Sequence, residues 1–210
     1  RYEVLSWANE SEGRYIIEDD YDSEFRYVGK PIPALQGNDT KGRVIYIGTL
    51  SKSIAPAIRV SYMVLPERLL EAYEQYGSFI SSTVSRIDQR ILEDFLDGGY
   101  YERHLNRMRT IYKSKRDVLM EEMKKLSSIC QVSGDRAGVH LLVRFTGNMT
   151  EKTAIRQAAR VGVKVYGLSE YYIRPMKGSG SATVLMGYAN LTEEEIREAV
   201  ALLQTVWMEA

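Results

Sequence analysis

Three short apolar runs constrain the fold of this chain more than any other feature of its sequence. They occupy residues 15–17, 44–47 and 60–65, after a stretch over 2–10 whose apolar residues have helical spacing. Each run is nearly continuous in apolar residues rather than alternating, which favours strands in a sheet covered on both faces. Proline ends the third run, as is common at a strand boundary. The sequence therefore predicts a helix followed by three strands of an α/β fold.

The remaining sequence divides into a helical stretch and an alternating one. From residue 67 to about residue 128, apolar residues recur at helical spacing, with Gly98 and Gly99 as a break. Thr192, before three glutamates, has the pattern of a helix N-cap. The helical stretch predicts a helix over 85–96 and one long helix, or two with a bend, over 100–126. Beyond it we expect strands over 140–145, 163–166 and 182–188, a glycine-rich turn over 177–180, and helices over 151–161 and 193–207.

These patterns suggest three parts. Residues 1–98 would be part of a larger domain, residues 99–128 a long interdomain helix, and residues 129–210 a small α+β domain. The chain begins at Arg1 without an initiator methionine or a signal-peptide pattern, so we expect it to be part of a longer protein.

The charge balance argues against nucleic-acid binding by this segment. Lys and Arg together number 28, and so do Asp and Glu. A surface that holds nucleic acid needs an excess of basic residues, which this sequence lacks. Any contact with DNA would therefore come from another part of the protein.

The cysteine and histidine content argues against disulfides and metal sites. Cys130 is the only cysteine, and His104 and His140 lie far from each other and from it in sequence. No apolar run approaches the ~20 residues that a membrane span requires. We therefore expect no metal and a cytoplasmic location.

Polar residues with complementary chemistry follow the first two apolar runs. Strand ends are where α/β sheets bind ligands. A lysine that can form a Schiff base, a carboxylate that can hold a protonated pyridine nitrogen, and a hydroxyl-rich cup with an arginine together meet the needs of pyridoxal 5'-phosphate (PLP). The candidates are Asp19, Asp20, Tyr21, Thr49, Ser51, Lys52 and Arg59.

Four stretches strengthen this interpretation: IIEDDYDSEFRY (16–27), PIPALQ (31–36), VIYIGTLSKSIAPAIRVSYMVLP (44–66) and ERHLNRMR (102–109). They resemble the aminotransferase-like domain of the MocR/GabR subfamily of GntR-type bacterial regulators. The resemblance implies a fold-type I PLP-dependent transferase, similar to aspartate aminotransferase, that follows an N-terminal winged helix-turn-helix domain. This chain resembles the later part of that PLP domain.

The resemblance also implies a role for each candidate residue. Asp19 would pair with the pyridine nitrogen, Tyr21 would hydrogen-bond the ring hydroxyl, and Lys52 would form the internal aldimine. The phosphate would be contacted by Thr49, Ser51 and Arg59. A carboxylate against the pyridinium keeps that nitrogen protonated and makes the ring an electron sink.

The sequence departs from an aminotransferase in one respect. Many such enzymes place an arginine for the substrate carboxylate near the strand that matches residues 182–188, but this stretch, ATVLMGY, has none. Arg144 and Arg174 are nearby candidates, although arginines in such positions are more often structural. The residues that stack on the ring and the glycine turn at the phosphate are expected upstream of this chain.

Three interpretations remain open at this stage. The first is an effector domain that binds an amine or amino acid through an aldimine and shifts the conformation of a DNA-binding regulator. The second is a genuine aminotransferase in which Lys52 also moves a proton. The third is a dimerisation module without a cofactor. In each case we expect a homodimer.

Overall fold

The computed structural model describes residues 1–173 and 182–208, and their contacts divide the chain into two compact units. The first unit comprises Arg1–Glu24 and Lys30–Arg107. The second comprises Phe25–Gly29 and the chain from Met108 onward. The larger domain, interdomain helix and small domain expected from the sequence stay a prediction.

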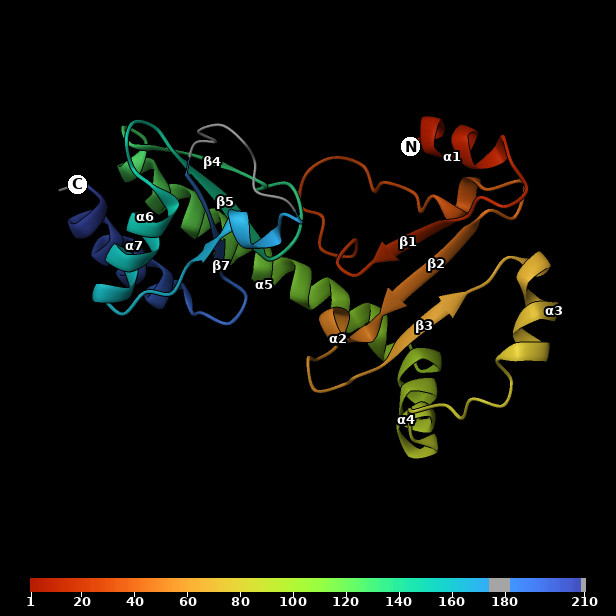
Figure 1. Cartoon of the computed structure of the whole chain (residues 1–210). Coiled ribbons are helices and arrows are strands. Elements are labelled where there is room, and N and C mark those ends of the chain that lie inside the picture. The colour runs from red at the N-terminus through yellow and green to blue at the C-terminus, as the bar shows by residue number, and fades with distance from the viewer. Residues whose placement is uncertain (174–181, 209–210) are drawn as a thin grey trace. The chain divides into compact units, whose positions relative to one another are not determined.

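The first unit contains a three-stranded sheet in the order β1-β2-β3. β1 (Ile16–Asp20) runs parallel to β2 (Val44–Thr49), whereas β3 (Ser61–Val64) is antiparallel to β2. Figure 1 shows β2 between its two neighbours, with the short helix α2 (Leu50–Ser53) directly after it. Helix α1 (Tyr2–Asn9) precedes β1, as expected.

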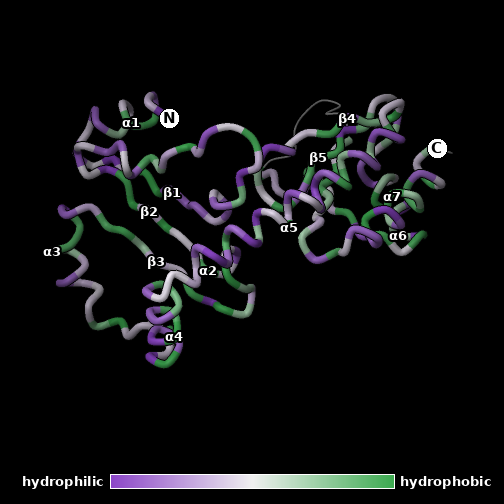
Figure 2. The backbone as a smooth tube through the Cα atoms, turned by 180° about the vertical axis from the view of Figure 1, so that it is seen from behind, coloured by the Kyte–Doolittle hydropathy of each residue, from purple (hydrophilic) through white to green (hydrophobic). Residues whose placement is uncertain are grey.

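All three predicted strands are present, but within residues 1–173 and 182–208 the sheet is not covered on both faces. Hydrophobic residues, drawn in green, lie along β1 and β2 (Figure 2). However, all four residues of β3 are exposed, and Ile17 in β1 is 66% exposed. The described part of this unit has a small core cluster of three buried side chains, which are Leu5, Leu35 and Val44. Near-continuous hydrophobicity therefore identified the strands correctly without predicting their burial.

Three further helices follow the sheet in sequence. α4 begins where the sequence predicted, because the Ser85 hydroxyl accepts a hydrogen bond from Asp88 N at 3.1 Å. α5 is a single helix, and a 3-10 turn over Lys124–Leu126 continues it. No helix among the described residues is both long enough and apolar enough to cross a membrane. The three helices are α3 (Glu67–Tyr76), α4 (Arg86–Asp97) and α5 (Tyr100–Met123).

The second unit contains an antiparallel sheet in the order β4-β5-β7-β6. Strand β5 and helix α7 have the predicted bounds, whereas the strand expected over 163–166 is reduced to β6, and β4 was missed. The turn expected over 177–180 lies outside the described residues. The elements are β4 (Cys130–Ser133), β5 (His140–Phe145), α6 (Glu151–Arg160), β6 (Tyr166–Gly167), β7 (Thr183–Gly187) and α7 (Glu193–Trp207).

The core of the second unit lies between this sheet and the helices packed on it. It contains buried residues from α5, α6, α7 and the strands. The Trp207 ring packs edge-on against Phe145 with 4.9 Å between ring centroids, and its indole N–H donates to Ala154 O at 3.1 Å. Phe25, from the inserted segment Phe25–Gly29, is 1% exposed and packs edge-on against Tyr112. The second unit thus has a continuous hydrophobic core.

Candidate functional site

The topology of the first sheet brings most of the predicted site residues to one edge. Because β1 and β2 are parallel, their carboxyl ends meet at that edge, with Asp20 opposite Gly48. β3 is antiparallel and begins there, with Ser61 opposite Thr49. We call this the Lys52 edge, and its residues are Asp19, Asp20, Tyr21, Thr49, Ser51, Lys52 and Arg59.

The two adjacent aspartates face different environments. Side chains alternate along a strand, and Asp19 is exposed whereas Asp20 is partly buried. The Asp20 carboxylate accepts hydrogen bonds from Tyr46 Oη at 2.9 Å and from Ser23 Oγ at 2.8 Å. Within the described residues, Asp19 has no hydrogen bond or ion pair. Asp19 is therefore the carboxylate that is free to meet a ligand.

Tyr21 continues the alternation two residues beyond Asp19. The nearby Asp22 carboxylate, partial burial and the Asp19 carboxylate, in that order, raise the pKa of its phenol. A tyrosine phenol is protonated at neutral pH already at its ordinary pKa, and the raised pKa does not change this, so Tyr21 can donate a hydrogen bond. This property suits a residue that donates to a ring oxygen.

The hydroxyls of Thr49 and Ser51 hold the loop that carries Arg59. Thr49 Oγ1 accepts from Ser51 N and donates to Val60 O, both at 3.2 Å, and Ser51 Oγ donates to Ile58 O at 2.6 Å. These bonds fix the chain on both sides of Arg59. Each hydroxyl has one hydrogen to donate, and here both hydrogens go to backbone carbonyls. The predicted contact of these hydroxyls with phosphate stays a prediction.

Lys52 and Arg59 are the cations of this edge, and both are exposed. Neither has an ion pair or side-chain hydrogen bond in the part of the chain that the structure describes. Asp19, Lys52 and Arg59 thus supply an unengaged carboxylate, amine and guanidinium at one sheet edge. These groups fit the pyridine nitrogen, the aldehyde and the phosphate of PLP in chemical type.

Two features of the first unit were not predicted from the sequence. A Cβ on Gly48 would lie 2.3 Å from Tyr62 Cζ, so any larger residue would require the Tyr62 ring to move. Tyr101 Oη donates to Glu24 at 3.5 Å, and burial is the main reason that the pKa of Glu24 is raised. The glycine directly after the apolar run 44–47 was the available signal, since a glycine in a strand often marks a close approach. No local pattern indicated the pair Glu24–Tyr101.

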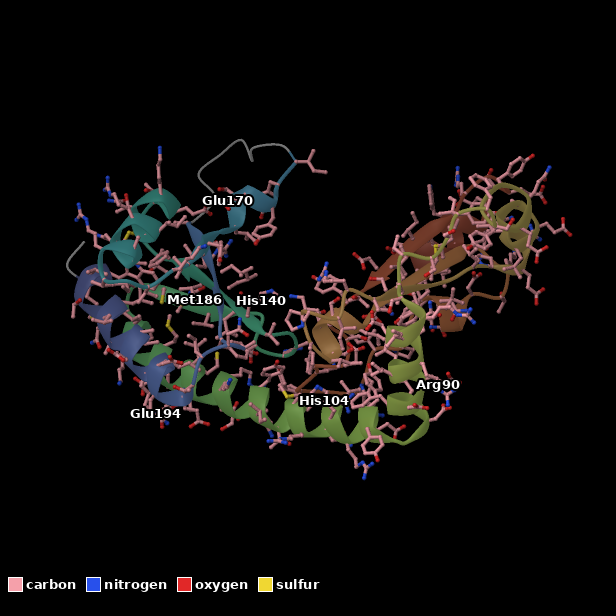
Figure 3. The ribbon with its side chains drawn as sticks, turned by 90° about the horizontal axis from the view of Figure 1, so that it is seen from below. Arg90, His104, His140, Glu170, Met186 and Glu194 are labelled. Atoms are coloured by element: carbon pink, nitrogen blue, oxygen red, sulfur yellow. The ribbon has the colours of Figure 1, made fainter. Side chains whose placement is uncertain are left out.

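Other candidates lie elsewhere. Arg144 is an exposed residue of β5 in the second unit, opposite Gln131, and Arg174 lies outside the described residues. His104 lies on α5 (Figure 3). Its ring is edge-on to that of Phe95, with 6.3 Å between ring centroids. Among the described residues no group of His, Cys, Asp and Glu has the arrangement of a metal site.

The chain belongs to the aminotransferase class I and II family. The model of that family matches residues 8–203, which is nearly the whole chain. Solved structures agree: kynurenine aminotransferase of Pyrococcus horikoshii, in complex with PMP, has a TM-score of 0.83 and 26% identity, covering 99% of this chain and 51% of that one. The predicted fold is therefore confirmed, in a family of PLP-dependent enzymes.

The curated relatives point to a particular group within this fold. The chain is 43% identical over 208 residues to the uncharacterized HTH-type transcriptional regulator YhdI of Bacillus subtilis, covering 99% of this chain and 44% of that protein. It is 32% identical over 205 residues to the probable rhizopine catabolism regulatory protein MocR of Rhizobium meliloti, covering 97% and 41%. The predicted resemblance to MocR-type regulators is confirmed. The chain spans less than half the length of these two relatives.

Proposed function

We propose that this chain is the PLP-binding effector domain of a MocR-type transcriptional regulator that senses an amine or amino acid. The observation that carries the proposal is the meeting of Asp19, Lys52 and Arg59 at one sheet edge, each without a partner among the described residues. The similarity to YhdI and MocR supports a regulator rather than an enzyme. A role in transcription implies a cytoplasmic location.

Each residue of the Lys52 edge would contact a different part of the cofactor. When bound, PLP supplies an aldehyde that condenses with amines and a ring that withdraws electrons. Asp19 would keep a proton on the ring nitrogen, and Tyr21 would donate to the ring oxygen. Arg59 would offer its planar fork to the phosphate, while the Lys52 amine would hold the aldehyde until an effector amine replaces it.

The first test is the position of covalent attachment. The protein is incubated with PLP, reduced with borohydride and digested, and its peptides are mapped by mass spectrometry. We expect the pyridoxyl group on Lys52, and Lys52→Arg should abolish the labelling. Label on another lysine would overturn the assignment.

The second test uses the adjacent aspartates as a matched pair. Asp19→Asn should weaken PLP binding strongly, because a neutral amide cannot stabilise a protonated ring nitrogen. Asp20→Asn should have a small effect on PLP binding, because the Asp20 side chain accepts hydrogen bonds from Tyr46 and Ser23. Affinity is measured by titration with PLP and absorbance. Equal losses in the two variants would refute the choice of Asp19.

A second candidate function, amino transfer, rests on the likeness to the Pyrococcus enzyme. Turnover with amino donors and a 2-oxo acid distinguishes the two functions, since a sensor needs binding without transfer. We expect an amino acid to perturb the cofactor spectrum without forming the new amino acid. Sustained turnover would favour the enzyme, and absence of any label at Lys52 would favour a cofactor-free module.

We propose further that the protein is a homodimer and that its DNA contact lies outside these residues. The first unit exposes large apolar side chains, which a partner surface would cover, notably Phe79 (78%), Ile80 (67%) and Ile87 (74%). The balanced charge of 28 basic and 28 acidic residues argues against DNA binding here. Light scattering of the chain tests the first statement, and a monomer would contradict it. A DNA titration tests the second, and salt-dependent DNA binding would contradict it.

A further inference from the structure

A second polar site lies at the opposite edge of the first sheet from Lys52. Here the chain enters β1 and β2, and Ile16 N donates to Arg43 O at 2.8 Å. A cavity of about 710 Å³ opens at this edge. It is lined by residues from the end of α1 and the following turn, from the loop before β2, and from the start of α3. A volume in this range suits a small molecule.

Arg43 lines the cavity, and its buried guanidinium lies over the Tyr15 ring, 5.7 Å from the ring centroid, without an acidic partner among the described residues. Arg43 is 4% exposed, and its Nη1 donates to Glu12 O. Its Nε is buried and has no hydrogen-bond partner among the described residues. No carboxylate of the described residues lies within ion-pair distance of it. A buried, incompletely paired cation is costly, and a ligand carboxylate is the group that would relieve that cost.

The same cavity contains an unpaired acceptor. Asn9 lines it, and Asn9 Oδ1 is buried without a hydrogen-bond partner in the described part of the chain. Two residues that line the same cavity therefore each have an unpaired polar atom: Arg43 Nε is a donor without an acceptor, and Asn9 Oδ1 is an acceptor without a donor. Both atoms are closed to solvent as the side chains stand, so a ligand that carries both complementary groups would pair with them after a small movement of the two side chains.

The charges around the cavity are of both signs. Two of its four acids are already engaged: Glu10 pairs with Arg14 at 2.7 Å, and Asp39 accepts backbone N–H bonds from its own loop. Among the described residues, the remaining side chains Glu12 and Glu67, and the cations Lys41 and Arg68, have no side-chain partner. A simple anion such as phosphate would face two free carboxylates, whereas a molecule with separate positive and negative groups matches both signs.

We propose that this cavity binds a small zwitterion of the amino-acid type, with its carboxylate on Arg43 and its ammonium toward Asn9, Glu12 and Glu67. Lys41 and Arg68 add positive charge beside the carboxylate. The site is separate from the Lys52 edge, so it stands independently of the proposed function. In a regulator it would give a second input that does not require covalent chemistry.

The test uses the Lys52→Ala variant of the chain, so that no amine can react at Lys52. Glycine is titrated into the 15N-labelled protein while the Arg43 Nε–Hε signal is followed by NMR. Acetate and methylammonium serve as the two halves of the ligand, and inorganic phosphate as the simple anion. We expect a saturable shift with glycine in the millimolar range, and much weaker effects from each half and from phosphate.

Exposed acids provide matched variants that should leave the fold intact. Glu67→Gln should weaken glycine binding about fivefold, as expected for one exposed charge contact, and leave the acetate effect unchanged. Glu71→Gln, on the same helix but outside the cavity lining, should change neither. The proposal is overturned if glycine gives no saturable shift, if acetate or phosphate binds as well as glycine, or if both variants weaken glycine equally.

Discussion

The two tryptophans of this chain show how differently its two units are built. Trp207 in the second unit is 1% exposed, packs on Phe145 and donates to a buried carbonyl. Trp7 in the first unit is 48% exposed, and its ring meets the Arg14 guanidinium at 4.9 Å. The second unit buries its apolar residues in a core, whereas the first unit exposes many of its own and contains the candidate cofactor site. Stability and proposed chemistry therefore lie largely in different parts of the chain.

The largest expected effect comes from removing each tryptophan in turn. Trp207→Ala should cost about 3–5 kcal/mol of unfolding free energy, because it leaves a cavity in a packed core. Trp7→Ala should cost about 1 kcal/mol or less, since it removes an exposed ring and one cation–π contact. Urea denaturation measures both changes, and hydrogen exchange in β5 and β7 locates the first. Similar losses in the two variants would contradict the contrast between the units.

A second effect should appear at alkaline pH and arise from the second unit. Burial raises the pKa of the Cys130 thiol from its usual 9.0 to about 11. The folded state thus favours the neutral thiol, and this stabilisation is present below about pH 9 and lost as the pH rises to about 11. The pKa values of Tyr112 and Tyr188 are also raised by burial, so they share the effect.

The contribution of Cys130 is isolated by comparing the protein with Cys130→Ala. We expect the difference in unfolding free energy between the two proteins to shrink by about 1–3 kcal/mol from pH 8 to pH 11. Below pH 8 the difference should be constant. A difference that stays constant up to pH 11 would show that the thiol is not protected by the fold.

A third effect should appear at acidic pH and arise from the first unit. Burial acts to raise the pKa of Asp39, but backbone N–H groups of Lys41, Val44, Arg43 and Gly42 outweigh it, and the net pKa is lowered. A lowered pKa gives stability above the ordinary carboxyl pKa that is lost as the pH falls. Asp39→Asn should therefore cost about 1–2 kcal/mol at pH 7 and less at pH 3.

The measurement for Asp39 is denaturation of the protein and of Asp39→Asn, followed at both pH values. The loss in Asp39→Asn should become smaller as the pH falls. A loss that is the same at pH 3 and pH 7 would mean that the negative charge of the Asp39 carboxylate does not contribute to it.

The same contrast explains which parts of the fold could be predicted from sequence. Helix α7 and strand β5 have strong apolar periodicity and were predicted with their observed bounds. Strand β4 has the sequence CQVS, in which two apolar residues give no clear pattern, and it forms by pairing with β5. Helix α2 is one turn long and depends on Thr49 as its cap. Short elements that rely on tertiary partners were therefore missed.

The site divides in a similar way. That residues 19–21 and 49–52 lie at one edge could be predicted, because parallel strands place their carboxyl ends together. The engagement of Asp20 by Tyr46 and the close approach of Gly48 to Tyr62 could not, because both depend on residues that are distant in sequence. Sequence thus identified the residue types at the edge, and the structure distinguished engaged groups from free ones.

The smallest expected effect concerns helix caps, one in each unit. Thr192 forms a capping box, in which its hydroxyl accepts from Glu195 N at 3.2 Å and Glu195 accepts from Thr192 N at 2.7 Å. Helix α7 buries four residues in the core, so Thr192→Ala should lower the unfolding free energy by about 0.5–1 kcal/mol. Ser85 caps α4 by accepting from Asp88 N at 3.1 Å and by donating its hydroxyl to the Asp88 carboxylate, but α4 buries only Leu92 among its residues. Ser85→Ala should therefore speed hydrogen exchange in the first turn of α4 without changing the urea midpoint at which the second unit unfolds. An equal loss of unfolding free energy in the two variants would show that the stability of the first unit depends on its helices as strongly as that of the second unit does.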